Sequence, residues 1–200
     1  MSEPIHAEAI LVAGVAASGK SAFGRALAAR LRWTLLDLDT LTSPLVVYAG
    51  GEGAVPATDA PRATANPHPT GRTELDRARY ACLYNSAREN LKLGQSVILV
   101  APFTAERNQP REWGDVPRRL GIRPDQVQLI WLDTPIREVA RRMSQRDASR
   151  DAGKLALLSA ADAVAPPPVD HVRLDGMLAP VQQVEQFLME QHAPPSPRIG

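Results

Sequence analysis

Eight residues near the N-terminus, Gly14 to Ser21, have the types and spacing that bind phosphate groups. The run reads GVAASGKS and matches the pattern G-x-x-x-x-G-K-[ST]. Its glycines let consecutive backbone N–H groups close on phosphate oxygens, and the positive end of a following helix dipole faces the same anion. We therefore expect a nucleotide-binding protein. The phosphate-contacting set predicted by this pattern is Gly14, Ala16, Ala17, Ser18, Gly19, Lys20, Ser21 and Ala22.

Lys20 and Ser21 have separate roles in such a loop. The lysine reaches the β- and γ-phosphates, and the serine hydroxyl ligates the Mg²⁺ ion that bridges them. The alternative is a glycine-rich turn with a purely structural role. The flanking residues favour phosphate binding, because an apolar strand is expected at 9–13 and a helical pattern at 23–31.

Two acids close the second predicted strand, which covers residues 33–36. We expect Asp39 to accept the proton of a substrate hydroxyl and Asp37 to hold the metal ion through water. For either acid, the alternative is a cap at the start of the next helix.

Arg142 and Arg146 lie one helical turn apart, and Arg150, Asp151 and Lys154 follow them. Arginine binds phosphate oxygens in pairs and can stack on a base, so this segment is a candidate phosphate lid. The alternative is a solvated arginine face on an amphipathic helix.

The remaining elements alternate between strands and helices, which predicts an α/β fold with a parallel sheet. Further strands are expected at 97–100, 126–132 and 171–174. We predict one domain over residues 1–192, with a substrate or lid insertion near 50–73, an arginine lid near 142–154, and a disordered tail at 193–200. The long irregular stretch at 50–71 is either a functional lid or a disordered insertion.

Three helices carry detailed expectations. Thr73 resembles the start of a capping box, Thr134 resembles an N-cap followed by Pro135, and Pro180 opens a last helix. The predicted inward-facing residues of these helices are Leu75, Ala78, Cys82, Ser86 and Leu93, then Ile136, Val139 and Met143, then Val181, Val184 and Leu188.

Two further places carry charged residues. Glu106 and Arg107 follow the third buried strand, where they either help to select an acceptor or form a loop salt bridge. Asp133 ends a strand-like run, but we expect it to join the N-terminus of the next helix, where a carboxylate is favoured.

Composition excludes several classes of function. The chain has 200 residues and a formal charge of +1, so no nucleic-acid partner is implied. Its one cysteine, Cys82, excludes an intrachain disulfide and fits a reducing compartment. No run approaches the length of a membrane span, so we expect no membrane partner and a cytoplasmic location.

The phosphate loop, the Asp37-Leu38-Asp39 pair and the arginine spacing together resemble the small P-loop kinases. This group includes shikimate kinase, gluconate kinase, chloramphenicol phosphotransferase, the zeta-toxin kinases and bacterial AAA-type ATP-binding proteins. The resemblance implies a three-layer P-loop NTPase fold with a five-stranded parallel sheet of order 2-3-1-4-5. It also implies that Asp37 is a metal-side acid, Asp39 the substrate-side acid, Arg142 an adenine neighbour and Arg146 a phosphate contact.

The chain also departs from individual members of that group. The glycine and arginine motifs that bind substrate in shikimate kinase are not evident, and Asp39 is not followed by the His-Pro of gluconate kinase. We expect a kinase that uses ATP and Mg²⁺ to phosphorylate a hydroxyl of a small molecule, as a monomer or homodimer. The alternatives are a nucleotide-binding regulator without an acceptor and a toxin-like kinase of nucleotide sugars.

Overall fold

The computed structural model describes residues 7–49, 73–145 and 165–192, and within these segments five parallel strands form one sheet. The strand order across the sheet is β2-β3-β1-β4-β5, which confirms the predicted order. The strands are β1 (Ala9–Ala13), β2 (Thr34–Asp37), β3 (Val97–Val100), β4 (Val127–Asp133) and β5 (Val172–Asp175). Three of them begin one residue later than predicted, which is within the usual uncertainty of strand ends.

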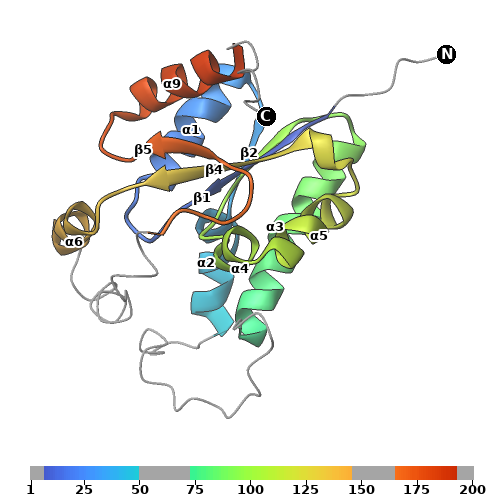
Figure 1. Cartoon of the computed structure of the whole chain (residues 1–200). Coiled ribbons are helices and arrows are strands. Elements are labelled where there is room, and N and C mark those ends of the chain that lie inside the picture. Colours follow the sequence, from blue (N-terminus) through green and yellow to red (C-terminus); the bar gives the residue numbers. More distant parts are fainter. Residues whose placement is uncertain (1–6, 50–72, 146–164, 193–200) are drawn as a thin grey trace.

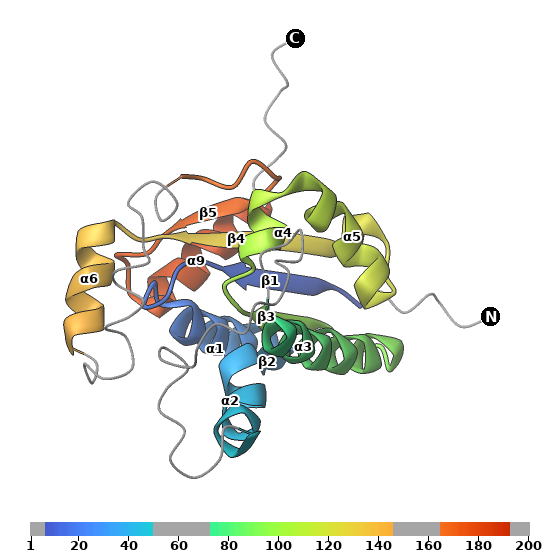
Figure 2. The same ribbon diagram turned by 90° about the horizontal axis from the view of Figure 1, so that it is seen from below.

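Helices cover both faces of this sheet. They are α1 (Lys20–Leu31), α2 (Leu38–Ala49), α3 (Glu74–Lys92), α4 (Thr104–Asn108), α5 (Pro110–Leu120), α6 (Ile136–Gln145) and α9 (Pro180–His192), with a short 3-10 helix at Pro124–Gln126. Figures 1 and 2 show α1 and α9 together on one face, and α3, α4 and α5 on the other. This arrangement confirms the predicted three-layer α/β fold. Among the described helices, none is both long and apolar enough to cross a membrane.

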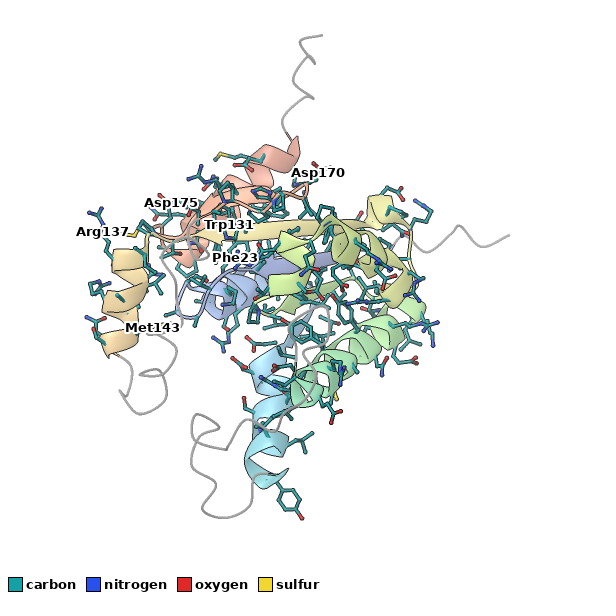
Figure 3. The ribbon with its side chains drawn as sticks, turned by 60° about the horizontal axis from the view of Figure 1, so that its bottom comes forward. Phe23, Trp131, Arg137, Met143, Asp170 and Asp175 are labelled. Carbon is teal, nitrogen blue, oxygen red and sulfur yellow. The ribbon has the colours of Figure 1, made fainter. Side chains whose placement is uncertain are left out.

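The core lies on both sides of the two central strands. Every residue of β1 and β3 is buried, because these strands lie inside the sheet with helices on each face. Leu11 and Leu99 pack in the cluster with α3 and α5, whereas Val12 and Val100 pack in the cluster with α1 and α9. Figure 3 shows Phe23 of α1, which belongs to the same cluster as Val12 and Val100. Because all four strand pairs are parallel, the carboxyl ends of the five strands lie at one edge of the sheet.

The predicted inward face of α3 is wrong. Cys82 is exposed, and Leu75 and Leu93 are 45% and 76% exposed. The face that packs carries two tyrosines and two leucines, which together bury more apolar area than the predicted face. The predicted face has only one leucine inside the helix, because Leu93 follows its last residue. The buried residues of α3 are Tyr80, Leu83, Tyr84, Ala87 and Leu91.

Helix starts and faces elsewhere give mixed outcomes. The Thr73 side chain accepts a hydrogen bond from Asp76 N at 3.1 Å, as predicted for an N-cap. Thr134 is not a cap, because α6 begins at Ile136 and the Thr134 hydroxyl donates to the carbonyl of Ser18 at 3.1 Å. On α9, Val181 is 64% exposed, contrary to expectation. Val184 is buried and Leu188 is partly buried against the core, as predicted. Phe187, which is not among the predicted residues, is also buried and supplies a larger apolar surface.

Gly24 allows α1 to pack closely against β3, and we predict that alanine there destabilises the fold. A Cβ at Gly24 would lie 2.5 Å from Cγ2 of Val100. Overpacking of this kind costs about 1–3 kcal/mol, more than the helix propensity that alanine gains. Urea unfolding of Gly24→Ala should show the loss.

The control for this prediction is Gly114→Ala in α5, where a Cβ would meet nothing within 4 Å. That variant should gain about 0.5–1 kcal/mol from helix propensity alone. Equal stability changes in both variants would contradict the packing explanation.

Candidate active site

The loop between β1 and α1 has the backbone geometry of a phosphate-binding turn. Gly14 and Gly19 have φ values of 150° and 103°, and Ala17 has a φ of 60°. A Cβ at Gly14 would lie 2.7 Å from the Ser18 hydroxyl oxygen, so only glycine fits there. Ala16 and Ala17 pack against Val139 and Met143 of α6, which fixes the outer side of the loop.

A fully buried hydroxyl in this loop fits a phosphate ligand. The side-chain oxygen of Ser18 is buried and has no hydrogen-bond partner among the described residues. Buried polar groups are nearly always paired, so an unpaired one in a phosphate-type loop favours a bound anion. Ala22 differs, since its side chain is exposed and its N–H donates to the Gly19 carbonyl at 3.0 Å.

Lys20 begins α1 and folds back over the loop. Its Nζ donates to the carbonyl oxygen of Val15 at 2.6 Å. The ammonium group therefore lies above the same turn whose backbone would hold the phosphates. A phosphate oxygen would attract this ammonium group more strongly than a neutral carbonyl does.

Ser21 and Asp37 lie side by side although 15 residues separate them in sequence. Both are expected on the metal side of the phosphates, so they are predicted to lie close together. The Ser21 hydroxyl donates to Oδ2 of Asp37 at 2.6 Å, and Asp37 is buried. The other oxygen of Asp37 accepts from the N–H groups of Asp39 and Thr40 at 3.0 and 3.3 Å. Asp37 therefore holds the first turn of α2, as the cap interpretation predicts, and its role as a metal-side acid stays a prediction.

A hydroxyl and a carboxylate are the hard oxygen ligands that Mg²⁺ prefers. Within the described segments, no group of three or more His, Cys, Asp or Glu side chains could hold a metal by itself. Ser21 and Asp37 would therefore share the ion with phosphate oxygens and water, which is usual for Mg²⁺.

Asp39 points to solvent and is paired with an arginine that the sequence analysis does not single out. Its side chain is 78% exposed, and its Oδ1 accepts from Nη2 of Arg79 at 2.6 Å. Arg79 on α3 also donates from Nε to the Thr42 hydroxyl at 2.8 Å. No local sequence signal marks Arg79, because its partners come from the packing of α3 on α2.

Arg142 lies against the phosphate loop. Its Nη1 donates to the carbonyl of Ser18 at 3.1 Å, and its Nη2 donates to the carbonyl of Gly176 at 2.9 Å. Gly176 follows β5, and a Cβ there would overlap the Thr134 hydroxyl. Arg142 thus joins the loop to the turn after β5. Arg146, the insertion at 50–72 and the tail at 193–200 lie outside the described residues, as does the arginine lid beyond Gln145.

The family of this chain follows from a match along most of its length. A family model described as an AAA domain, AAA_33, matches residues 10–168, which include the phosphate loop, Asp37, Asp39 and Arg142. The chain belongs to this AAA-domain family. No curated protein matches its sequence.

Solved structures similar to this AAA domain include kinases of small molecules. A sugar kinase from Janibacter sp. HTCC2649 is 21% identical, with a TM-score of 0.60 over 92% of this chain and 93% of that one. A gluconokinase from Sinorhizobium meliloti 1021 is 19% identical, with a TM-score of 0.56 over 92% and 98%. APS kinase CysC of Mycobacterium tuberculosis, solved with AMPPNP and APS, is 17% identical, with a TM-score of 0.57 over 95% and 100%. The fold of this AAA domain is therefore that of the P-loop small-molecule kinases.

Glu106 is buried inside the AAA domain and bonded to side chains of other helices. It is fully buried, and its Oε1 accepts from the Tyr84 hydroxyl at 3.0 Å and from Arg119 at 3.3 Å. Burial, and then the charge of Glu106, raise the pKa of Tyr84 well above its ordinary value. The salt-bridge interpretation of Glu106 is thus favoured, with Arg119 of α5 as its partner, while Arg107 beside it is buried as well.

Asp133 does not join a helix N-terminus, contrary to expectation. Its carboxylate accepts from Nε of Arg173 at 2.9 Å, across the β4–β5 pair. The parallel register places these residues two positions apart on one face of the sheet, so a long arginine side chain reaches the acid. The carboxylate of Asp133 therefore forms an ion pair between two strands of the sheet.

Glu138 near the start of α6 binds two arginines, and it is not among the predicted site residues. It accepts from Arg141 at 2.6 and 2.7 Å and from Nε of Arg142 at 2.6 Å. The hydrogen bonds from Arg141 and then Arg142 lower the pKa of Glu138 from 4.5 to about 2. Its spacing of four residues before Arg142 is a signal that could have identified the pair.

We predict that Glu138 stabilises the AAA domain above pH 4.5 and that this contribution is lost as the pH falls toward 2. The folded-state pKa lies below the unfolded one, so the unfolded chain binds more protons in that window. Urea unfolding of wild type and Glu138→Gln should therefore differ by a constant amount above pH 5 or so, with the difference shrinking at lower pH. A difference independent of pH would contradict the assignment.

Proposed function

We propose that the protein is an ATP- and Mg²⁺-dependent kinase that transfers the γ-phosphoryl group to a hydroxyl group of a small molecule. The observation that carries this proposal is the placement of Lys20, Ser21 and Asp37 around the phosphate loop. Asp39 follows two residues after Asp37 and is open to solvent. The similar sugar kinase, gluconokinase and APS kinase structures support the same class of activity.

The loop and the residues at its end would bind the triphosphate. Backbone N–H groups from Gly14 to Ser21 and the start of α1 supply positive potential. Lys20 would leave the carbonyl of Val15 and contact the β- and γ-phosphates. Ser21 and Asp37 would hold the Mg²⁺ ion, which offsets the negative charge of the phosphate oxygens.

Asp39 would handle the acceptor. It accepts a hydrogen bond from the acceptor hydroxyl and takes its proton as the oxygen attacks the γ-phosphorus. The bond from that phosphorus to the bridging oxygen breaks, and ADP leaves with its charge offset by Lys20. Arg79 holds one oxygen of Asp39, which orients the carboxylate before the acceptor arrives. Arg146 is proposed as a further phosphate contact.

The test is ADP release by the full chain with Mg²⁺ and ATP, across a panel of hydroxylated metabolites, sugar acids, nucleosides and nucleotide sugars. We expect release above the basal rate with at least one acceptor, abolished by EDTA. Nucleotide binding by calorimetry without release on any acceptor would contradict the kinase and favour a nucleotide-binding regulator. Absence of binding to ATP or GTP would contradict the nucleotide site itself.

A further inference from the structure

The position of Arg142 relative to the reacting groups can be read from the order of the strands. Ser21 and Asp37 mark the Mg²⁺ side of the phosphate loop, and Asp37 ends β2, on one side of β1. Arg142 bonds Gly176 after β5, which lies on the other side of β1. A nucleotide whose terminal phosphate lies beside Asp37 would therefore extend its base toward Arg142. The guanidinium stands close to the loop, with Nη1 3.5 Å from where a Cβ on Gly19 would be.

Three separate segments fix the orientation of this guanidinium. Nε is held by Glu138, Nη1 by the loop carbonyl of Ser18, and Nη2 by the carbonyl of Gly176. The carbonyls are neutral, so Glu138 supplies the one charged partner among the described contacts of Arg142. The glutamate side chain is only 10% exposed, whereas that of Arg142 is 25% exposed and keeps part of its surface open to a ligand.

Helix α6, which carries Glu138, packs against the phosphate loop. Val139, the next residue, is fully buried and packs with Met143 on Ala17 of the loop. In Figure 3, Met143 and Arg137 both lie on α6, and Arg137 points away from the sheet. Glu138 thus precedes Val139 on a helix that is itself packed on the phosphate-binding turn.

We propose that Glu138 is a positioning residue for the base end of the nucleotide. It holds Arg142 between the phosphate loop and the turn after β5, so the base meets a guanidinium that is already ordered. This inference rests on the proposed nucleotide site. Ordering a long side chain before binding removes an entropic cost that would otherwise reduce affinity.

The test compares two ligands on wild type and Glu138→Gln. One is Mg·ATP and the other is Mg·tripolyphosphate, which has the phosphate chain but no base; both are measured by competition against a fluorescent ATP analogue. We expect Glu138→Gln to weaken ATP about fivefold, from the cost of ordering one arginine, and to change tripolyphosphate affinity less than about twofold.

Arg141→Ala is the matched control. Arg141 bonds the same glutamate, but its other side-chain partner is Gln145, on its own helix. We expect ATP affinity within about twofold of wild type, because the Glu138–Arg142 contact remains. In an Arg142→Ala background, Glu138→Gln should have no further effect on ATP affinity, because its target is gone.

Several results would overturn the inference. Equal losses for ATP and tripolyphosphate would mean that Glu138 supports the loop rather than the base end. Unchanged ATP affinity in Glu138→Gln, tighter ATP binding, or a loss in Arg141→Ala as large as in Glu138→Gln would also contradict it. Failure of wild type to bind either ligand would instead overturn the proposed function, so the two failures are distinguishable.

Discussion

Replacing Lys20 with alanine is expected to lower kcat for phosphoryl transfer by about 10²- to 10³-fold, comparable with the loss of one strong transition-state donor. Lys20 places its ammonium over the turn that would hold the phosphates, where its charge would offset the charge that develops on the leaving ADP. The fold should survive, because Lys20 is only partly buried at the start of α1. Steady-state ADP release, with circular dichroism to check folding, measures the effect.

The matched control for that variant is Lys92→Ala. Lys92 ends α3, is 57% exposed and pairs with Glu89 on the same helix. Its removal should leave both kcat and the KM for ATP within about twofold, since exposed pairs of this kind contribute little. Normal turnover in Lys20→Ala would contradict the assignment of the loop to a reacting triphosphate.

Replacing Asp39 with asparagine is expected to lower kcat by about 10²- to 10⁴-fold while ATP affinity stays within a few-fold. The amide cannot take the proton of the acceptor, but its oxygen can still accept from Arg79. The side chain is 78% exposed, so the substitution should not unfold the chain. Calorimetry with an unreactive ATP analogue, together with acceptor-dependent ADP release, separates binding from transfer.

Asp76→Asn is the control for Asp39→Asn. Asp76 is the other acid beside Arg79, at 3.9 Å, and its side chain is 42% exposed. It should leave turnover nearly unchanged, because it lies on α3 rather than next to Asp37. Equal losses in the two variants would mean that the charge around Arg79, rather than proton transfer, controls the rate.

The strands and the phosphate-binding loop can be predicted from local sequence, whereas the order of the strands is predicted from the resemblance to the small P-loop kinases. Buried parallel strands are continuous apolar runs, and the glycines and lysine of the loop stand at fixed spacing, so both are visible without tertiary information. The same holds for Ser21 and Asp37, because parallel strands bring their carboxyl ends to one edge. The Ser21 hydroxyl oxygen lies 2.6 Å from Oδ2 of Asp37, in agreement with their expected place at that edge.

The remaining features depend on packing between elements. Helices α4 and α5 cannot be predicted from periodicity, because α4 has only five residues and Pro110, Gly114 and Pro117 interrupt the pattern of α5. The pairing of Arg79 with Asp39 needs the approach of α3 to α2, which no local pattern encodes. The inward face of α3 also depends on packing, because spacing alone does not show that the face with Tyr80 and Tyr84 buries the larger apolar area.

The contact of Gly176 with Thr134 links the beginning of the chain to its last third. Thr134 donates to the carbonyl of Ser18, Arg142 bridges that carbonyl to Gly176, and no side chain fits at Gly176. During synthesis, the phosphate-binding turn would therefore stay incomplete until β5 has left the ribosome. A shortened chain that ends after α6 would retain the glycine-rich motif and still lack one wall of its site.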